Sequence, residues 1–222
     1  RAVRTCSGGE AARLGAIAQS RANELAEWLD HRTSELEFLQ SSELIGGLYA
    51  KWHLRGDRVA LHTLRMRIEA YAKANKYADA FVLNEKGETV SGDDGLPVAS
   101  PPALQATALQ AITNDRPQFT DPYRDTTSAV PDRIDFVAPI GLPQGARGGV
   151  GLRLDPQSYL APMLSQWPVP TTSGRAVLLR RDGERVIRFS IAEPAKMTAE
   201  TARVAREKSI PREIVLQSME DA

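Results

Sequence analysis

The amino-acid sequence predicts an α+β protein in which a long N-terminal helix precedes two tandem modules with antiparallel sheets. Three observations lead to this prediction: a repeated ten-residue pattern, a helical N-terminal stretch, and short apolar runs separated by turn residues. Residues 81–90 read FVLNEKGETV and residues 177–186 read VLLRRDGERV, 96 positions later. Both contain an apolar run, a polar turn and Gly-Glu-x-Val, which is the pattern of a β-hairpin. The repeat indicates two related modules, although such short patterns also arise by chance.

The composition limits the functions that are open to the chain. Its 222 residues are enough for one large domain or for two of about 100 residues. Lys and Arg total 28, as do Asp and Glu, so the net charge is zero. A neutral chain lacks the overall positive field that holds phosphate backbones, so nucleic acid is not an expected partner. The single cysteine excludes a disulfide scaffold but leaves the cellular compartment open.

The two ends of the chain lead us to expect a segment of a longer protein. The sequence opens RAVRTCSGGE, without an initiator Met and without the apolar core of a signal peptide. It contains no run of about 18 apolar residues, so no membrane-spanning helix is predicted within it. We therefore expect any membrane anchors to lie outside these residues.

Residues 9–44 are predicted to form one long helix. Good helix formers are dense, and apolar or long-stemmed side chains recur mostly at steps of three and four. Such a seam packs against the helix's own domain or against a second chain, and the alternative is an amphipathic surface helix. Gly46 and Gly47 interrupt the pattern, and a second helix is expected over 57–75. The seam positions are Leu14, Ala18, Arg21, Leu25, Trp28, Arg32, Leu36 and Leu39.

The first module is expected to contain about five antiparallel strands with helices on one side. Residues 80–83 form a continuous apolar run, which is typical of a central strand that is buried on both faces. The Pro pair at 101–102 is typical of a helix start. The other expected elements are a loop at 91–102, a helix at 103–112, a short strand at 118–120, a polar loop at 121–133, and strands at 134–140 and 149–154.

A connecting helix at 155–167 is expected to lead to the second module and its hairpin at 176–190. Helical segments are predicted over 197–209 and 211–219. Nothing like IDFVAPIG or GVGLRLD follows this hairpin, so the second module is predicted to be truncated or reduced. The resulting division is a stalk helix over 1–45, a first module over 46–158 and the start of a second module over 159–222.

Four passages carry a resemblance to a known family. They are NELAEWLDHR, FVLNEKGETV, IDFVAPIG with GGVGLRLDPQSYL, and QWPVPTTSGRAVLLRRDGERVI, and together they extend over nearly the whole chain from about residue 12. In this order and spacing they resemble the extracytoplasmic double Cache, or tandem PAS-like, sensor domains of bacterial transmembrane receptors. In that family the membrane-proximal module continues further and leads to a second transmembrane helix, which agrees with a segment of a longer protein.

The resemblance implies a periplasmic sensor. A small molecule would bind the membrane-distal module, the N-terminal helix would shift within a homodimer, and a cytoplasmic output would respond. In this family the output is a histidine kinase of a two-component system, a diguanylate cyclase or a chemotaxis domain. No such output domain is present in this sequence.

The segment DPYRD at 121–125 supplies the first candidate ligand-binding residues. Arg124 offers a planar fork for a carboxylate, Tyr123 offers a flat wall with a hydroxyl, and Asp125 can accept from an ammonium group. An amino acid, an organic acid or an amine would need such groups. The alternative is a local salt bridge between Arg124 and Asp125 with Tyr123 packed beside it.

Four further residues are candidates for the same site. Because side chains alternate along a strand, Arg133 and Asp135 are expected to share one face and Phe136 the other. Tyr77 and Asp79 approach the first strand from the helix side and could close the site. The alternatives are exposed edge charges for Arg133 and Asp135, and helix-end packing for Tyr77.

The family comparison also contains a departure. Its amino-acid-binding members carry a spaced set of Tyr, Arg, Trp, Tyr and Asp in the distal module. The three Trp residues of this chain, at positions 28, 52 and 167, lie away from the predicted strands of the site. This departure puts an amino-acid ligand in doubt.

Other classes of function find less support in the sequence. The His residues at 31, 53 and 62 lack the spacing of metal ligands, and GARGGVG lacks the Lys-Ser/Thr of a phosphate loop. No cofactor, metal or catalytic residue is therefore expected. The main alternative to a sensor is a structural spacer that dimerises through the long helix without binding a ligand, and an enzyme ranks third.

Overall fold

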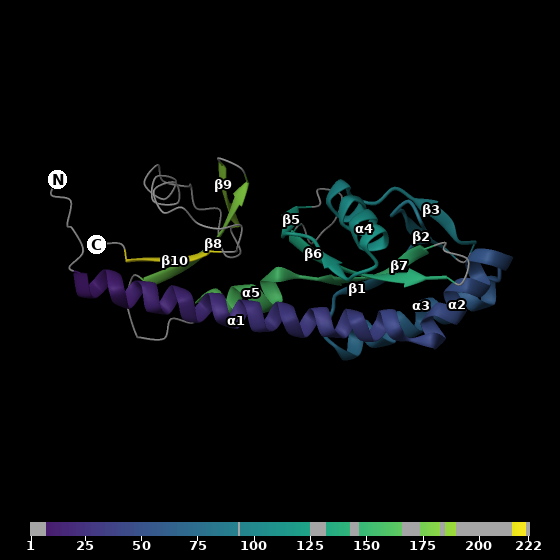
Figure 1. The fold of residues 1–222 in the computed structure, drawn as a ribbon, viewed down its shortest axis with the longest axis horizontal. Coiled ribbons are helices and arrows are strands. Elements are labelled where there is room, and N and C mark those ends of the chain that lie inside the picture. Colours follow the sequence, from purple (N-terminus) through teal and green to yellow (C-terminus); the bar gives the residue numbers. More distant parts are fainter. Residues whose placement is uncertain are drawn as a thin grey trace. The chain divides into compact units, whose positions relative to one another are not determined.

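A computed structural model describes residues 8–92, 94–124, 132–142, 147–165, 174–182, 185–189 and 215–220 (Figure 1). The chain divides into two compact units. One contains residues 29–156, and the other contains residues 1–28 together with 157–222. Every helix among the described residues is too short or too polar to cross a membrane.

Helix α1 (Gly8–Ser41) confirms the predicted long helix. Within the unit of residues 29–156, its seam buries Leu36 and Leu39 completely or nearly so. Both side chains belong to the predicted spacing of three and four residues. The helix ends just before Ser42, whose hydroxyl accepts a hydrogen bond from the Ile45 N–H and so caps the next helix.

The expected break at Gly46 and Gly47 is wrong, because both glycines lie inside helix α2 (Glu43–Arg55). Tertiary packing overrides the low helix propensity of glycine here, since Ile45 and Tyr49 are buried on the same helix. The helix ends at Gly56, where a φ of 65° provides the left-handed cap.

Substitution of Gly47 should therefore stabilise the protein. A Cβ added at Gly47 meets no atom within 4 Å, so Gly47→Ala should raise the free energy of unfolding by about 0.5–1 kcal/mol. Urea unfolding followed by circular dichroism measures this. Gly56→Ala is the matched control and should lower the free energy of unfolding by about 1 kcal/mol, because its backbone is left-handed. Equal effects at the two glycines would contradict the helical assignment.

Helix α3 (Arg58–Ala74) begins at Asp57, whose side chain accepts a hydrogen bond from the Ala60 N–H. It confirms the predicted second helix. Its apolar stripe contains Leu61, Leu64 and Ile68, all fully buried. The amphipathic pattern of the sequence thus identifies the face of α3 that packs in the core.

The unit of residues 29–156 has a sheet of seven antiparallel strands among the described residues, in the order β3-β2-β1-β7-β6-β4, with β5 also paired to β6. The predicted strands at its centre are confirmed. Two expected loops instead include the short strands β3 and β5, whose two or three residues are too few for a periodic signal. The strands are β1 (Asp79–Leu83), β2 (Thr89–Ser91), β3 (Leu96–Val98), β4 (Gln118–Phe119), β5 (Tyr123–Arg124), β6 (Asp132–Gly141) and β7 (Arg147–Leu154).

The helices lie on both faces of this sheet, so the expectation of helices on one side is wrong (Figure 1). Helix α4 (Pro102–Asn114) covers one face, where Leu104, Ala108 and Ala111 pack with Phe81, Leu83 and Val137. Helices α2 and α3, with the part of α1 from residue 29 on, lie along the opposite face. The continuous apolar run at 80–83 is consistent with this arrangement, because β1 is buried on both of its faces.

The other unit contains helix α5 (Pro156–Ser165) and a three-stranded sheet in the order β10-β8-β9. Strands β8 (Gly174–Asp182) and β9 (Arg185–Phe189) pair antiparallel, as the predicted second hairpin requires. Residues 215–220 form strand β10 (Val215–Glu220), which corrects the helix predicted there. Pairing with the distant strand β8 overrides the local pattern. The helix predicted over 197–209 lies outside the described residues.

Candidate functional site

Three charged residues form a row across the centre of the seven-stranded sheet. Asp79 on β1 lies opposite Arg153 on β7, and Arg153 lies opposite Asp135 on β6. Side chains alternate along strands, so these three share the face of Phe81 and Val137, against which α4 packs. The register therefore places a polar row beside the apolar patch that α4 covers.

Asp135 is the centre of this row, and its exposed fraction is 0%. The Arg153 guanidinium donates two hydrogen bonds to its carboxylate, from Nε to Oδ1 at 2.8 Å and from Nη2 to Oδ2 at 3.1 Å. The Tyr123 hydroxyl donates a third, to Oδ2 at 2.5 Å. A bidentate pair of this kind is strong and fixes the orientation of both groups.

Strand β6 is also held at this point through its backbone. The Asp135 N–H donates to the Thr120 hydroxyl, and the Asp135 carbonyl accepts from the Thr120 N–H, both at 2.9 Å. Thr120 is itself buried. Asp135 is thus fixed by its main chain as well as by its side chain. We call Asp79, Tyr123, Asp135 and Arg153 the polar cluster.

The Arg153 guanidinium packs against an aromatic ring in addition to its hydrogen bonds with Asp135. Its central carbon lies 5.0 Å from the centroid of the Phe81 ring, a cation–π arrangement. Gly151 makes room for this ring, because a Cβ at that position would overlap it. Burial lowers the pKa of Arg153, but the hydrogen bond and charge of Asp135, together with the charges of Tyr123 and Asp79, raise that pKa overall. Arg153 is therefore a permanent cation.

The Tyr123 hydroxyl is a permanent donor for a related reason. Burial raises the pKa of Tyr123, and the charge and hydrogen bond of Asp135 raise it further. The charges of Arg153 and Arg133 oppose this effect but do not cancel it. The phenol therefore stays protonated at physiological pH and donates a hydrogen bond to Asp135.

The structure brings together some of the residues that the sequence predicted for the site. Tyr123, Asp135 and Asp79 belong to the polar cluster. Arg133 pairs in register with Tyr123 and, by alternation, shares the sheet face of Asp135. Asp125 lies outside the described residues.

Two predicted residues lie apart from the cluster. The Arg124 side chain is 64% exposed and pairs with Asp132 on the neighbouring strand, with Nε 3.1 Å from Oδ1. Tyr77 lies on the other side of the sheet, where its ring and that of Phe136 form a T-shaped pair with 6.0 Å between the ring centroids. For Tyr77 the structure matches the packing alternative.

Tyr77 instead connects helix α1 to the sheet. Its hydroxyl donates to Glu35 at 2.6 Å, and Arg32 lies over its ring, 4.7 Å from the centroid. Arg32 also donates to Glu35 at 2.9 Å. Burial and the hydrogen bond to Glu35 raise the pKa of Tyr77, so its hydroxyl stays protonated. This contact fixes α1 against the end of the α3–β1 connection.

The sequence analysis missed Arg153, which is the main partner of Asp135. A signal for it was present, because Arg153 is the one charged residue in the predicted strand GVGLRL. It also shares its strand face with Gly149 and Gly151, which leave space beside it. Which residues it meets depends on the register of β1, β7 and β6, which a single sequence does not reveal.

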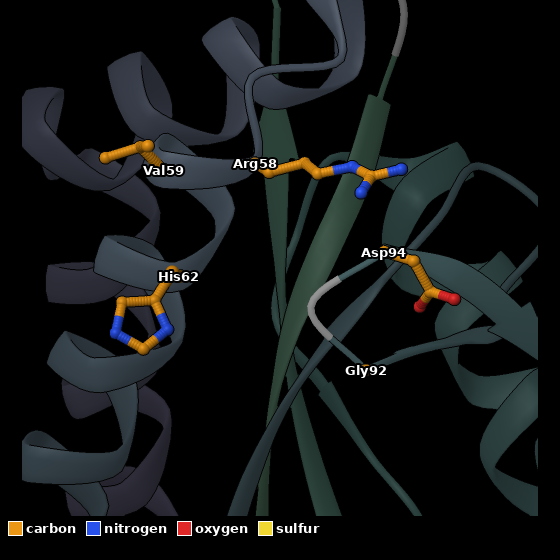
Figure 2. Close-up of a pocket in the computed structure, with 5 residues that line it drawn as sticks. All are labelled: Arg58, Val59, His62, Gly92 and Asp94. Carbon is orange, nitrogen blue, oxygen red and sulfur yellow. The ribbon is translucent and has the colours of Figure 1, made fainter.

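A separate cavity of about 620 Å³ lies where α3 begins, near the turn between β2 and β3 (Figure 2). Its lining includes Arg58, Val59 and His62 from α3 and Gly92 and Asp94 from the turn. None of these residues was predicted for the site, and the side chains of Arg58, Val59 and Asp94 are exposed. Among the described residues, no group of three or more His, Cys, Asp or Glu side chains could hold a metal ion.

Comparison with known proteins identifies the fold. No family model and no curated protein matches the sequence. Among solved structures, the extracellular domain of the candidate histidine kinase vpHK1S-Z8 is 12% identical, with a TM-score of 0.64 and coverage of 98% of this chain and 97% of that one. The ligand-binding domain of the Pseudomonas fluorescens chemoreceptor CtaA, in complex with L-isoleucine, is 15% identical, with a TM-score of 0.54 and coverage of 94% and 91%.

A third similar structure is the ligand-binding domain of the Pseudomonas aeruginosa PAO1 chemoreceptor PctC in complex with GABA. It is 20% identical, with a TM-score of 0.51 and coverage of 76% of this chain and 70% of that one. The chain has the fold of these sensor domains. This confirms the predicted α+β fold class and the resemblance to extracytoplasmic Cache-type sensors at the level of the fold.

Proposed function

We propose that this chain is an extracytoplasmic ligand-sensing region of a bacterial transmembrane signalling receptor, and that a small molecule binds at the polar cluster. The buried pair of Asp135 and Arg153 is the observation that carries this proposal. Removing two charges from water is costly, and a well-packed apolar pair would often be at least as stable. Buried, fixed charges of this kind gather at functional sites more often than elsewhere.

The similar structures support the same conclusion. PctC was solved with GABA and CtaA with L-isoleucine, which are both small molecules that bear a carboxylate. In our proposal, Arg153 and Arg133 supply the cationic groups of the site, while Tyr123 and Asp135 orient them.

The contact between Tyr77 and Glu35 provides a route for the signal. Strand β6 carries Asp135 on one face and Phe136 on the other, and the ring of Phe136 meets Tyr77. A ligand that shifts β6 would therefore move Tyr77, and with it helix α1. In a homodimer paired through α1, differential affinity for two helix positions would transmit the signal to an output outside this chain.

A thermal-shift screen against amino acids, organic acids and amines tests this proposal. One class should raise the melting temperature by several degrees, as mass action requires for a ligand of the native state. Arg153→Gln should abolish the shift, whereas Arg124→Gln should keep it because Arg124 is exposed and pairs with Asp132. A shift that survives Arg153→Gln would place the ligand elsewhere.

A spacer without a ligand is the second candidate, and one observation favours it. Phe38 on α1 is 64% exposed and stacks on Tyr71 with 6.4 Å between ring centroids, so an aromatic surface is available to a second chain. A spacer would dimerise in sedimentation experiments, lose the dimer on Phe38→Ser, and give no thermal shift with any compound.

A further inference from the structure

The Arg153 guanidinium of the polar cluster has hydrogen-bond donors that Asp135 and Tyr123 leave unused. A guanidinium has five N–H donors. Asp135 accepts two of those of Arg153, one on each oxygen, and Tyr123 adds a third hydrogen bond to the same carboxylate. Among the described residues, the Nη1 end of Arg153 makes no hydrogen bond. The free end of the Arg153 guanidinium is therefore a cationic donor.

The Asp79 carboxylate lies next to Arg153 Nη1 but forms no hydrogen bond with it. Its Oδ2 is 4.0 Å from Arg153 Nη1, a distance that allows charge attraction but is too long for a hydrogen bond. Its Oδ1 accepts the N–H of Ala80 at 2.8 Å, which keeps the carboxylate close to its own strand. The Asp79 side chain is 58% exposed, whereas that of Arg153 is 17% exposed. Asp79 can therefore leave Arg153 at little cost, while Arg153 stays in place.

We propose that the ligand is a small carboxylate without an amine, and that Asp79 is a built-in competitor for its position on Arg153. The ligand carboxylate would hydrogen-bond to the Nη1 end of Arg153 and move the Asp79 carboxylate away. The affinity of the site then depends on how much more strongly Arg153 binds the ligand carboxylate than it binds the Asp79 carboxylate. This inference rests on the proposed function and names the ligand class of the same site.

The geometry favours a simple carboxylate over an ammonium or a zwitterion. An ammonium group needs acceptors, and the Asp135 oxygens already accept from Arg153 and Tyr123. Asp79 is the remaining acid of the row, but an ammonium bound there would lie next to the Arg153 cation. Like charges at such a distance repel. A carboxylate gains the unused donors of Arg153, and the negative charge that opposes it there is that of Asp79, which is 58% exposed and can move away.

Two probes of equal length give a sharp test, namely butyrate and GABA, which differ only in the terminal amine. Isothermal titration calorimetry of the full chain should show that butyrate binds more tightly than GABA. Asp79→Asn should tighten butyrate binding about two- to fivefold, since exposed ion pairs contribute little and the competing charge is gone. Asp30→Asn is the matched control, because it removes one exposed negative charge from α1 and should leave the affinity unchanged.

The other results have distinct meanings. Weaker butyrate binding by Asp79→Asn, unchanged binding, or a preference for GABA would each overturn this inference. If GABA or another compound still binds and Arg153→Gln removes that binding, the proposed sensor function stands and only the ligand class is wrong. If no compound of any class binds the wild-type chain, the proposed function fails together with the inference.

Discussion

Asp135→Ala should lower the free energy of unfolding by about 3–5 kcal/mol, the range found when one partner of a buried ion pair is removed. The substitution leaves the Arg153 cation largely buried without its bidentate partner, and it removes the acceptor of the Tyr123 hydroxyl. The effect should appear as a lower midpoint in guanidinium unfolding with an unchanged slope.

Asp79→Ala is the control for this prediction, because Asp79 also pairs with Arg153 but is mostly exposed. Asp79→Ala should lower the free energy of unfolding by no more than about 1 kcal/mol, as for other exposed ion pairs. Asp135→Ala combined with Arg153→Leu should be more stable than Asp135→Ala alone, since no unpaired cation remains. Equal costs for Asp79→Ala and Asp135→Ala would show that the buried pair does not hold the sheet together.

The alternation of side chains along β6 was predictable, and it placed Arg133 and Asp135 on one face with Phe136 on the other. The same rule could not say which strands flank β6. Arg153 was missed because its meeting with Asp135 depends on a register set between residues 18 positions apart. Tyr77 was predicted for the ligand site, and it lies on the sheet face opposite Asp135, beside Phe136. No pattern in the neighbouring sequence shows which of the two faces it approaches.

The helices illustrate the same division between local and tertiary information. The spacing of Leu36 and Leu39 predicted the buried side of α1. The two glycines of α2 predicted a break, and the buried ring of Tyr49 on the same helix explains why the helix continues. Strand β10 was predicted as helix because its partner, β8, lies far away in the sequence. Local patterns identify elements, whereas contacts between distant residues decide the ambiguous ones.

Gly148→Ala should lower the free energy of unfolding by about 2–4 kcal/mol, through overpacking and the loss of one buried hydrogen bond. A Cβ at Gly148 would overlap the hydroxyl of Tyr49 and lie 2.7 Å from the carbonyl oxygen of Leu83. The Tyr49 hydroxyl donates to that same carbonyl at 3.0 Å, and the side chain is fully buried. The added methyl group would therefore push α2 away from the paired strands β1 and β7.

Tyr49→Leu supplies the test of this cause. A leucine does not reach Gly148, so Gly148→Ala should cost much less in the Tyr49→Leu background than in the wild type. Gly47→Ala, on the same helix as Tyr49 but with open space around it, controls for the effect of an added methyl group. Equal costs of Gly148→Ala in the two backgrounds would mean that the backbone of β1, rather than the Tyr49 ring, resists the substitution. In that case the requirement for glycine at position 148 would come from the sheet alone.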